Sequence, residues 1–247
     1  MDSLYIVIPA YNEAENIATT IKEWYEIIEK YNSDGRSRLV IVDDGSSDET
    51  LEICENEKIE REFLEVISKK NGGHGSSIYA GYKYALEKGA EYIFQTDSDG
   101  QTFASEFEQF YEARKEYDVQ IGNRKRREDG IARVVISAFV RLVVLIIFKV
   151  RVEDVNTPYR LMKAESLKVA MDYIPEGYSL TNIALTGIWG KMAKGKINNN
   201  KRINMRFVPI SFRPRQGGIN SINPAKIVRI GIRALSDLSE INRKVGK

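Results

Sequence analysis

The chain has 247 residues, enough for one large domain or two small ones. Its composition, 43% hydrophobic and 29% charged, is ordinary for a globular protein. Its single cysteine, Cys54, excludes an internal disulfide and suits a reducing compartment. The net charge of +2 conceals an asymmetry: residues 1–62 carry 16 acids and 6 bases, whereas residues 191–233 carry 11 bases and no acid. This basic segment indicates an anionic partner, such as phosphate, nucleic acid or membrane head groups.

Short apolar runs alternate with helical patterns through the first half of the chain. Strands are predicted over residues 4–9, 39–42, 63–67, 92–96 and 119–122, with helices between them. Asn12 is expected to cap the first helix, and Ser46 and Glu49 form a capping-box pattern before the second. This alternation predicts an α/β fold in which a mostly parallel sheet has helices on both faces.

Polar clusters follow three of the predicted strands, at residues 9–13, 43–46 and 97–99. Because the carboxyl ends of parallel strands meet at one edge of a sheet, we expect these clusters to face one rim, where ligands bind in such folds. Asp43 and Asp44 can accept hydrogen bonds from base N–H groups or ribose hydroxyls. Taken by itself, the string Asp43-Asp44-Gly45 favours a turn that opens a helix.

Asp97 and Asp99 follow the fourth predicted strand. Carboxylates two residues apart on an extended segment share one side of it, and they repel each other unless a cation joins them. A divalent metal with oxygen ligands, shared with a phosphate-bearing substrate, is one interpretation. The other is an acidic turn, since Asp-Ser-Asp-Gly is good turn chemistry by itself.

The second half of the chain has a different pattern. Residues 131–150 form a strongly apolar helix crossed by a polar stripe of Arg133, Ser137 and Arg141, which favours burial in the core, with a membrane interface as the alternative. Asn198–Asn200 suggest a hairpin before a strand over residues 204–212, and Pro224 begins a final amphipathic helix.

Four motifs in the first half carry a family resemblance: VIPAYNEAENI, IVDDGSSDET, NGGHGSSIYAGYKYAL and FQTDSDGQT. In this order and spacing they resemble the family 2 glycosyltransferases, whose fold is GT-A. The later strings DVQIGNRKR and DVNTPYRLM resemble the dolichyl- or polyprenyl-phosphate sugar synthase branch, although residues 156–160 depart from its pattern of small residues. The resemblance extends to about residue 221.

The resemblance implies roles for individual residues. The nucleotide-sugar site would comprise Pro9, Tyr11, Glu13, Asp43, Asp44, Asp97 and Arg215, with Arg215 on a mobile loop over the diphosphate. The metal, Mg²⁺ or Mn²⁺, would be held by Asp97, Asp99 and Gln101 and would neutralise charge on the leaving diphosphate. Arg124 and Arg133 would contact phosphates. Asp154 would serve at the acceptor, as a general base for a hydroxyl or to orient an already ionised phosphate.

The expected function is an inverting, metal-dependent transfer of a sugar from a UDP- or GDP-linked donor to a membrane-linked acceptor, a polyprenyl phosphate. A saccharide hydroxyl in cell-surface polysaccharide synthesis is an alternative acceptor. Residues 1–123 would bind the donor and residues 124–247 the acceptor, in one continuous catalytic domain. We expect a cytoplasmic protein, peripheral at the inner face of the membrane, with no nucleic-acid partner.

Two other classes of function remain open from the sequence. The string Asp97-Ser98-Asp99-Gly100 superficially matches the nucleophile loop of haloacid dehalogenase-type phosphatases, but Gln101 stands where that loop has threonine, and three strands precede it. A non-enzymatic anion- or membrane-binding module on an inactive GT-A scaffold would explain the basic segment but not the acidic rim.

Overall fold

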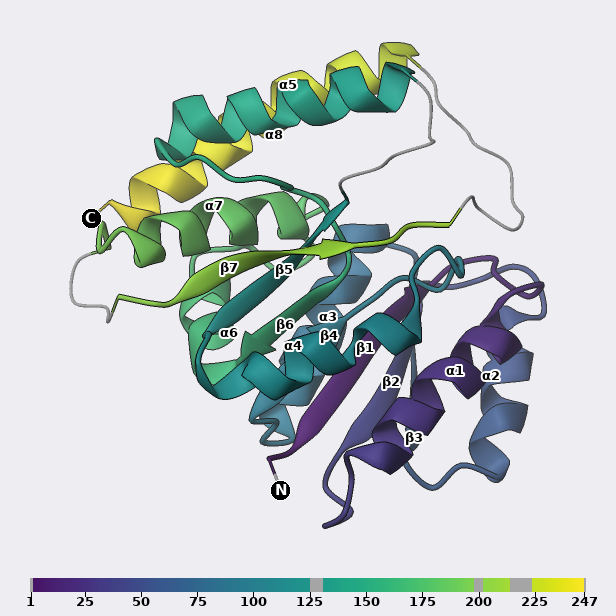
Figure 1. Ribbon diagram of the computed structural model, residues 1–247. Helices are drawn as coiled ribbons and strands as arrows, with labels where there is room; N and C mark the ends of the chain where they lie inside the picture. The colour runs from purple at the N-terminus through teal and green to yellow at the C-terminus, as the bar shows by residue number, and fades with distance from the viewer. Residues whose placement is uncertain (1, 125–130, 198–201, 214–223, 247) are drawn as a thin grey trace.

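The computed structural model describes residues 2–124, 131–197, 202–213 and 224–246, and within them seven strands form one sheet in the order β3-β2-β1-β4-β6-β5-β7 (Figure 1). The strands are β1 (Leu4–Ala10), β2 (Arg38–Asp43), β3 (Leu64–Ser68), β4 (Tyr92–Gln95), β5 (Val119–Arg124), β6 (Arg160–Lys163) and β7 (Met205–Ile210). Strand β6 runs antiparallel to both neighbours and every other pairing is parallel, so the mostly parallel α/β sheet is confirmed.

Helices cover both faces of the sheet (Figure 1). They are α1 (Ile17–Lys30), α2 (Thr50–Ile59), α3 (His74–Glu87), α4 (Glu108–Glu112), α5 (Ile131–Phe148), α6 (Ala164–Met171), α7 (Thr181–Ala193) and α8 (Pro224–Val245), with short 3₁₀ turns η1 (Ala104–Glu106) and η2 (Ala113–Lys115). Strand β1 shows why two cores form: Tyr5 and Val7 pack with the α3 and α7 side, whereas Leu4, Ile6 and Ile8 pack with the α1 side. Alternating side chains on a central strand bury both faces.

The connections place a switch point between β1 and β4. From β1 the chain moves through α1 to β2 and through α2 to β3, and α3 then returns it across the opposite face to β4 on the other side of β1. In open α/β sheets the carboxyl ends of the strands diverge at such a point, and ligands bind in the resulting crevice.

Helix α3 lies close against β1 and β2 because Gly81 has no side chain. A Cβ atom there would lie 2.3 Å from Val7 Cγ1 and 3.0 Å from Val42 Cγ2. We therefore expect Gly81→Ala to lower the free energy of unfolding in urea by about 1–3 kcal/mol through overpacking. Gly246→Ala, where the nearest atom would be 3.5 Å away, is the control; equal unfolding midpoints for both variants would contradict this packing account.

Two capping predictions are wrong. Asn12 lies at φ 54°, five residues before the start of α1, and its Oδ1 accepts a hydrogen bond from Ser47 N at 2.8 Å, because the segment after β1 turns sharply before the helix begins. No side-chain capping bond is formed at Glu49, the residue before α2. Ser46 Oγ instead accepts a hydrogen bond from Asn12 N at 3.0 Å. Both side chains thus bind the two rim loops to each other.

The apolar side chains of α5 divide between two faces. Val143, Val144 and Phe148 are buried, and Phe148 packs against α7 at Gly187. The outer face is exposed: Ile136, Phe139, Leu142, Leu145 and Ile146. The prediction of core burial is wrong for that face, because α5 lies beside α8 at the edge of the molecule (Figure 1). Across the described ranges, no helix has the length and apolarity needed to cross a membrane.

The last elements agree only partly with the expected hairpin. The element before Asn198 is helix α7 and not a strand, and β7 pairs in parallel with β5, so the described residues form no hairpin here. Strand β7 ends two residues before the predicted end. Asn198–Asn200 lie outside the described residues. Helix α8 begins at Pro224, as predicted.

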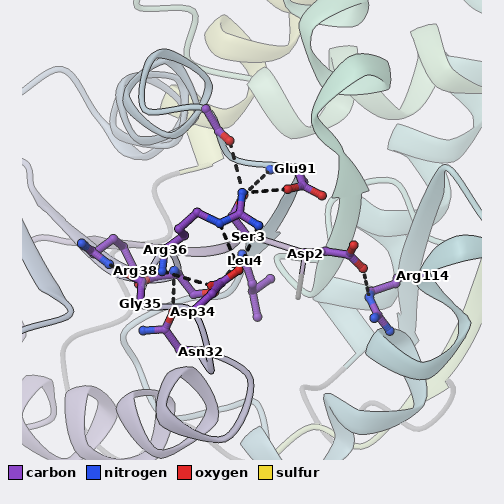
Figure 2. Close-up of polar contacts among 12 residues, drawn as sticks. Asp2, Ser3, Leu4, Asn32, Asp34, Gly35, Arg36, Arg38, Glu91 and Arg114 are labelled. Carbon is purple, nitrogen blue, oxygen red and sulfur yellow. Dashed lines mark hydrogen bonds and ion pairs between the residues drawn. The ribbon is translucent and has the colours of Figure 1, made fainter.

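Ion pairs close the opposite edge of the sheet, where the strands begin. Figure 2 shows Arg36 between Asp34 and Glu91, at 3.0 Å and 3.1 Å, and Arg114 donating to Asp2 at 2.9 Å. Each acid here has a cationic partner. The arrangement is therefore a structural one.

Candidate active site

A cavity of about 380 Å³ opens at the carboxyl ends of β1 and β4, at the switch point of the sheet. Its walls are formed by Pro9, Ala10, Tyr11, Glu13, Asp44, Asn71, Gly73, His74, Ser77, Asp97, Ser98 and Asp99. The prediction that the three polar clusters face one rim is therefore confirmed. This volume lies in the range of small-ligand sites, and four of the described residues that line the cavity are acidic.

Asp97 and Asp99 both line this cavity. The prediction that they do so because they alternate along an extended strand is wrong. Strand β4 ends at Gln95, so the two carboxylates belong to a bend that closes at Gly100, where φ is +66°. Asp99 Oδ1 accepts a hydrogen bond from Gln101 N at 3.1 Å, which tightens the bend. The turn chemistry and the clustering of carboxylates are thus both present.

The donor atoms at this bend fit a divalent cation that shares its ligands with a substrate. Asp97 Oδ1 is buried and makes no hydrogen bond to any described residue. Among the described residues no group of three or more His, Cys, Asp or Glu side chains is arranged to hold a metal. Mg²⁺ and similar cations are commonly held by one or two carboxylates together with substrate phosphates, which is the set that Asp97 and Asp99 offer.

Gln101 has a different environment from the two aspartates. It is buried and does not line the cavity; its Nε2 donates to Arg213 O at 3.0 Å, and Arg213 N donates to Gln101 O at 2.8 Å. This pair of bonds holds the segment after β7 next to the bend. The described geometry gives Gln101 a bracing contact, and its role as a metal ligand remains a proposal.

Asp43 and Asp44 lie in different surroundings. Asp43 does not line the cavity, because its carboxylate accepts hydrogen bonds from Gly45 N and Ser46 N, both at 3.2 Å, and from Ser68 Oγ at 3.1 Å. These are the contacts of a turn, the plainer of the two interpretations.

Asp44 does line the cavity, and donors surround it. Lys69 Nζ lies 2.5 Å from Oδ1, Gly72 N 3.0 Å from the same atom, and Gly73 N 2.7 Å from Oδ2. Burial by itself raises the pKa of Asp44, but hydrogen bonds from Lys69, Gly72, Ser77 and Gly73 outweigh it and leave that pKa below its usual value. Asp44 is therefore a firmly ionised acceptor on the cavity wall.

Tyr11 and Glu13 form the wall contributed by the segment after β1. The Tyr11 side chain is 48% exposed at the mouth, whereas Glu13 is buried and its Oε2 accepts a hydrogen bond from Asn16 Nδ2 at 3.1 Å. Glu13 N donates to Thr50 Oγ1 at 2.8 Å, which fixes this segment to the start of α2. An exposed aromatic ring beside buried polar groups is suited to stacking on a flat ligand.

His74 was given no site role in the sequence interpretation, yet it lines the cavity. It is the first residue of α3, and its Nε2 lies 3.6 Å from Asp97 Oδ1. Gly73 precedes it at φ +84°. A glycine-rich loop that opens a helix is a common anion-binding feature, because the free N–H groups and the helix dipole favour negative charge; this signal in NGGHG marks the region.

Arg124 and Asp154 form a two-pronged ion pair at the carboxyl end of β5, and neither residue lines the cavity. Arg124 Nε lies 2.8 Å from Oδ2 and Nη2 lies 2.9 Å from Oδ1, and the side chains are only 10% and 11% exposed. The Arg124 guanidinium also lies 5.3 Å from the ring centre of Phe212. Since both carboxylate oxygens accept from Arg124, this arrangement favours an orienting role for Asp154 over that of a proton acceptor.

The two remaining predicted arginines are not placed. Arg215 lies outside the described residues, and the side chain of Arg133, near the start of α5, lies outside them as well. Their assignment to phosphate contacts remains a prediction.

Residues 5–174 match the profile of glycosyl transferase family 2. Undecaprenyl-phosphate mannosyltransferase of Micrococcus luteus is 25% identical over 243 residues, which cover 92% of this chain and 93% of that protein. Undecaprenyl-phosphate 4-deoxy-4-formamido-L-arabinose transferase of Pectobacterium atrosepticum is 28% identical over 142 residues, or 56% of this chain and 42% of that protein.

A solved structure confirms the fold. Glucosyl-3-phosphoglycerate synthase from Mycobacterium tuberculosis, in complex with Mn²⁺ and uridine-diphosphate-glucose, superimposes with a TM-score of 0.65 at 14% identity, over 97% of this chain and 79% of that one. The GT-A fold expected from the sequence motifs is therefore shown.

Proposed function

This chain belongs to glycosyl transferase family 2 and is a glycosyltransferase, and from this premise we propose that it transfers a sugar from a nucleoside diphosphate donor to a polyprenyl phosphate at a membrane surface. The observation that carries the proposal is the cavity at the switch point, which is lined by Asp97, Asp99 and Asp44. Two relatives named as undecaprenyl-phosphate sugar transferases support the choice of acceptor.

In this proposal the nucleoside lies among Pro9, Tyr11, Glu13 and Asp44. The ring of Tyr11 stacks on it, and the ionised Asp44 accepts hydrogen bonds from base or ribose donors. Asp43 acts indirectly, because its turn positions Asp44 and Ser46. The glycine-rich loop before α3 and the N-terminus of that helix lie on the side where the diphosphate would extend.

The residues proposed to hold the cation, Mg²⁺ or Mn²⁺, are Asp97 and Asp99, with Gln101 as a further oxygen donor. Bound there, the cation would supply positive charge to the departing diphosphate. A structural relative that contains Mn²⁺ and uridine-diphosphate-glucose supports the assignment.

At the acceptor side we propose one displacement with inversion. A phosphate oxygen of the acceptor forms the new bond to the anomeric carbon, while the bond from that carbon to the diphosphate oxygen breaks on the opposite face. An ionised phosphate needs no base, so Asp154 holds Arg124 toward the acceptor. Arg133 and Arg215 would add phosphate contacts. The halves 1–123 and 124–247 would then serve donor and acceptor respectively.

The exposed apolar face of α5 supports a peripheral place at the membrane. Side chains such as Ile146, which is 65% exposed, stand beside exposed bases at Arg141 and Lys149, a combination suited to an anionic bilayer surface.

We expect Ile146→Glu to lower co-sedimentation with anionic liposomes at least about tenfold, because it places a charge within the buried apolar contact. Ile59→Glu is the matched control: Ile59 is 81% exposed, but it lies at the end of α2, away from α5. Equal loss in both variants, or no binding by the unmodified protein at low salt, would contradict a membrane role for α5.

The transfer reaction itself can be tested directly. Incubation with labelled UDP- and GDP-sugars, Mn²⁺ and a short polyprenyl phosphate is expected to give a labelled glycolipid and one nucleoside diphosphate per sugar transferred. The product's anomeric configuration should be opposite to the donor's. Label in a saccharide and none in lipid would refute the proposed acceptor, and rapid hydrolysis of a generic phosphate ester would refute the reaction class.

A further inference from the structure

A fully buried arginine lies behind the acidic bend. Arg160 is the first residue of β6, where it pairs with Gln95 of β4, two residues before Asp97. It has no solvent-exposed surface, and among the described residues no carboxylate lies within ion-pair distance of it. Burying a cation without a directly paired anion is costly, and an apolar side chain would avoid that cost. The contacts of its guanidinium show what the charge is used for.

The guanidinium of Arg160 binds the backbone of the loop that carries Asp154. Its Nε and Nη2 both donate to Thr157 O, at 3.1 Å and 2.6 Å. Its Nη1 reaches α7, where Asn182 O lies at 3.3 Å and Thr186 Oγ1 at 3.4 Å. A planar, five-donor side chain can make these contacts at once, and lysine cannot.

Thr186 acts on the same loop from the same side. Its hydroxyl lies 2.9 Å from Val155 O and 2.8 Å from Asn182 O, and it can donate to either. Hydrogen bonds to the backbone carbonyls of Val155 and Thr157 thus hold the segment from Asp154 to Arg160. Arg124 holds the Asp154 carboxylate separately. The contacts with Val155 O and Thr157 O therefore restrain the loop that directly follows Asp154.

The charge of Arg160 also acts over a longer range. Burial lowers the pKa of Arg160 to about 10, while Tyr82 and the carboxylates of Asp154 and Asp97 act in the opposite direction. The side chain is therefore cationic at neutral pH, and its charge interacts favourably with the carboxylates of Asp97 and Asp154.

From these contacts we infer that Arg160 is a positioning residue for sugar transfer: it fixes the loop that presents Asp154 and Arg124 to the acceptor phosphate. The acceptor phosphate in this inference rests on the proposed function, whereas the contacts that hold the loop do not depend on it. Among the described residues, the hydrogen bonds of Arg160 reach Thr157, Asn182 and Thr186 and none of the residues that line the cavity, so we expect its loss to affect transfer more than donor binding.

The test compares Arg160→Lys, Arg160→Met and Thr186→Val with a matched variant, Gln120→Met. Gln120 is also buried and polar and lies on the neighbouring strand β5, where it pairs with Leu161, but its side chain bonds Phe110 O and Arg206, on the face of the sheet opposite to α7. For the three loop variants, kcat for transfer is expected to fall about tenfold or more, because small misplacements of reacting groups are costly. Manganese-dependent binding of the nucleoside diphosphate should stay within twofold, and Thr186→Ser should retain the wild-type rate.

Amide hydrogen exchange gives a readout that does not need activity. Exchange at residues 155–157 should be faster in Arg160→Lys than in wild type, with no change around β1 and β4. Wild-type transfer rates in the arginine variants, nucleotide binding that falls in step with transfer, or an equal loss in Gln120→Met would each overturn the inference. If wild type transfers no sugar, the proposed function fails; unchanged exchange at residues 155–157 then refutes the positioning role as well, and faster exchange upholds it.

Discussion

Asp97→Asn and Asp99→Asn are each expected to lower sugar transfer by at least about a hundredfold at saturating Mg²⁺ or Mn²⁺, because either change removes an anionic ligand while keeping the side-chain shape. Stability should change little. Asp97 Oδ1 makes no hydrogen bond to a described residue, and an asparagine at position 99 can still accept from Gln101 N. We expect the free energy of unfolding to stay within about 0.5 kcal/mol of wild type.

The control for this prediction is Glu15→Gln, an exposed carboxylate on the loop after β1 that does not line the cavity. Its turnover should match that of wild type. If the two aspartate variants also turned over donor at the wild-type rate with either metal, the assignment of Asp97 and Asp99 to the cation would be wrong.

Loss of the Asp154 carboxylate should have the largest combined effect. In Asp154→Ala the guanidinium of Arg124 stays mostly buried without its two-pronged partner, which is expected to cost about 3 kcal/mol of unfolding free energy. Transfer should also fall by at least about tenfold, since Arg124 is no longer directed at the acceptor. Urea unfolding and the transfer assay measure the two effects separately.

A pair of different burial provides the comparison. Lys30 and Glu108 lie 2.7 Å apart, but their side chains are 53% and 56% exposed, so Glu108→Gln should change the unfolding free energy far less than Asp154→Ala does and leave transfer unchanged. A double-mutant cycle with Arg124→Met then isolates the coupling in the buried pair. Zero coupling between positions 124 and 154 would show that the ion pair is not held in solution.

Local sequence patterns were sufficient to predict the strands that position the proposed donor site. Apolar runs such as residues 4–9 and 39–42 match β1 and β2 within a residue or two at each end, since a strand buried on both faces has a clear composition. Because the ends of parallel strands share an edge, the placement of Tyr11, Asp44 and Asp97 around one cavity followed without knowledge of strand order.

Features fixed by long-range contacts were not predictable from those patterns. The antiparallel insertion of β6 between β4 and β5 depends on pairing across the chain, and this pairing buries Arg160. His74 required knowledge that the start of α3 meets the bend after β4. The outer face of α5 looked like core because composition alone does not reveal which side of a helix has a neighbour.

The central claim is that a divalent cation at Asp97 and Asp99 holds the diphosphate of a sugar donor in the switch-point cavity. Crystals soaked with Mn²⁺ and UDP or GDP measure this directly through the anomalous signal of manganese. The account predicts a peak within about 2.5 Å of a carboxylate oxygen of both residues and of a phosphate oxygen, with the nucleoside beside Tyr11 and Asp44. A nucleotide bound elsewhere, or these two side chains turned away from it, would contradict the account.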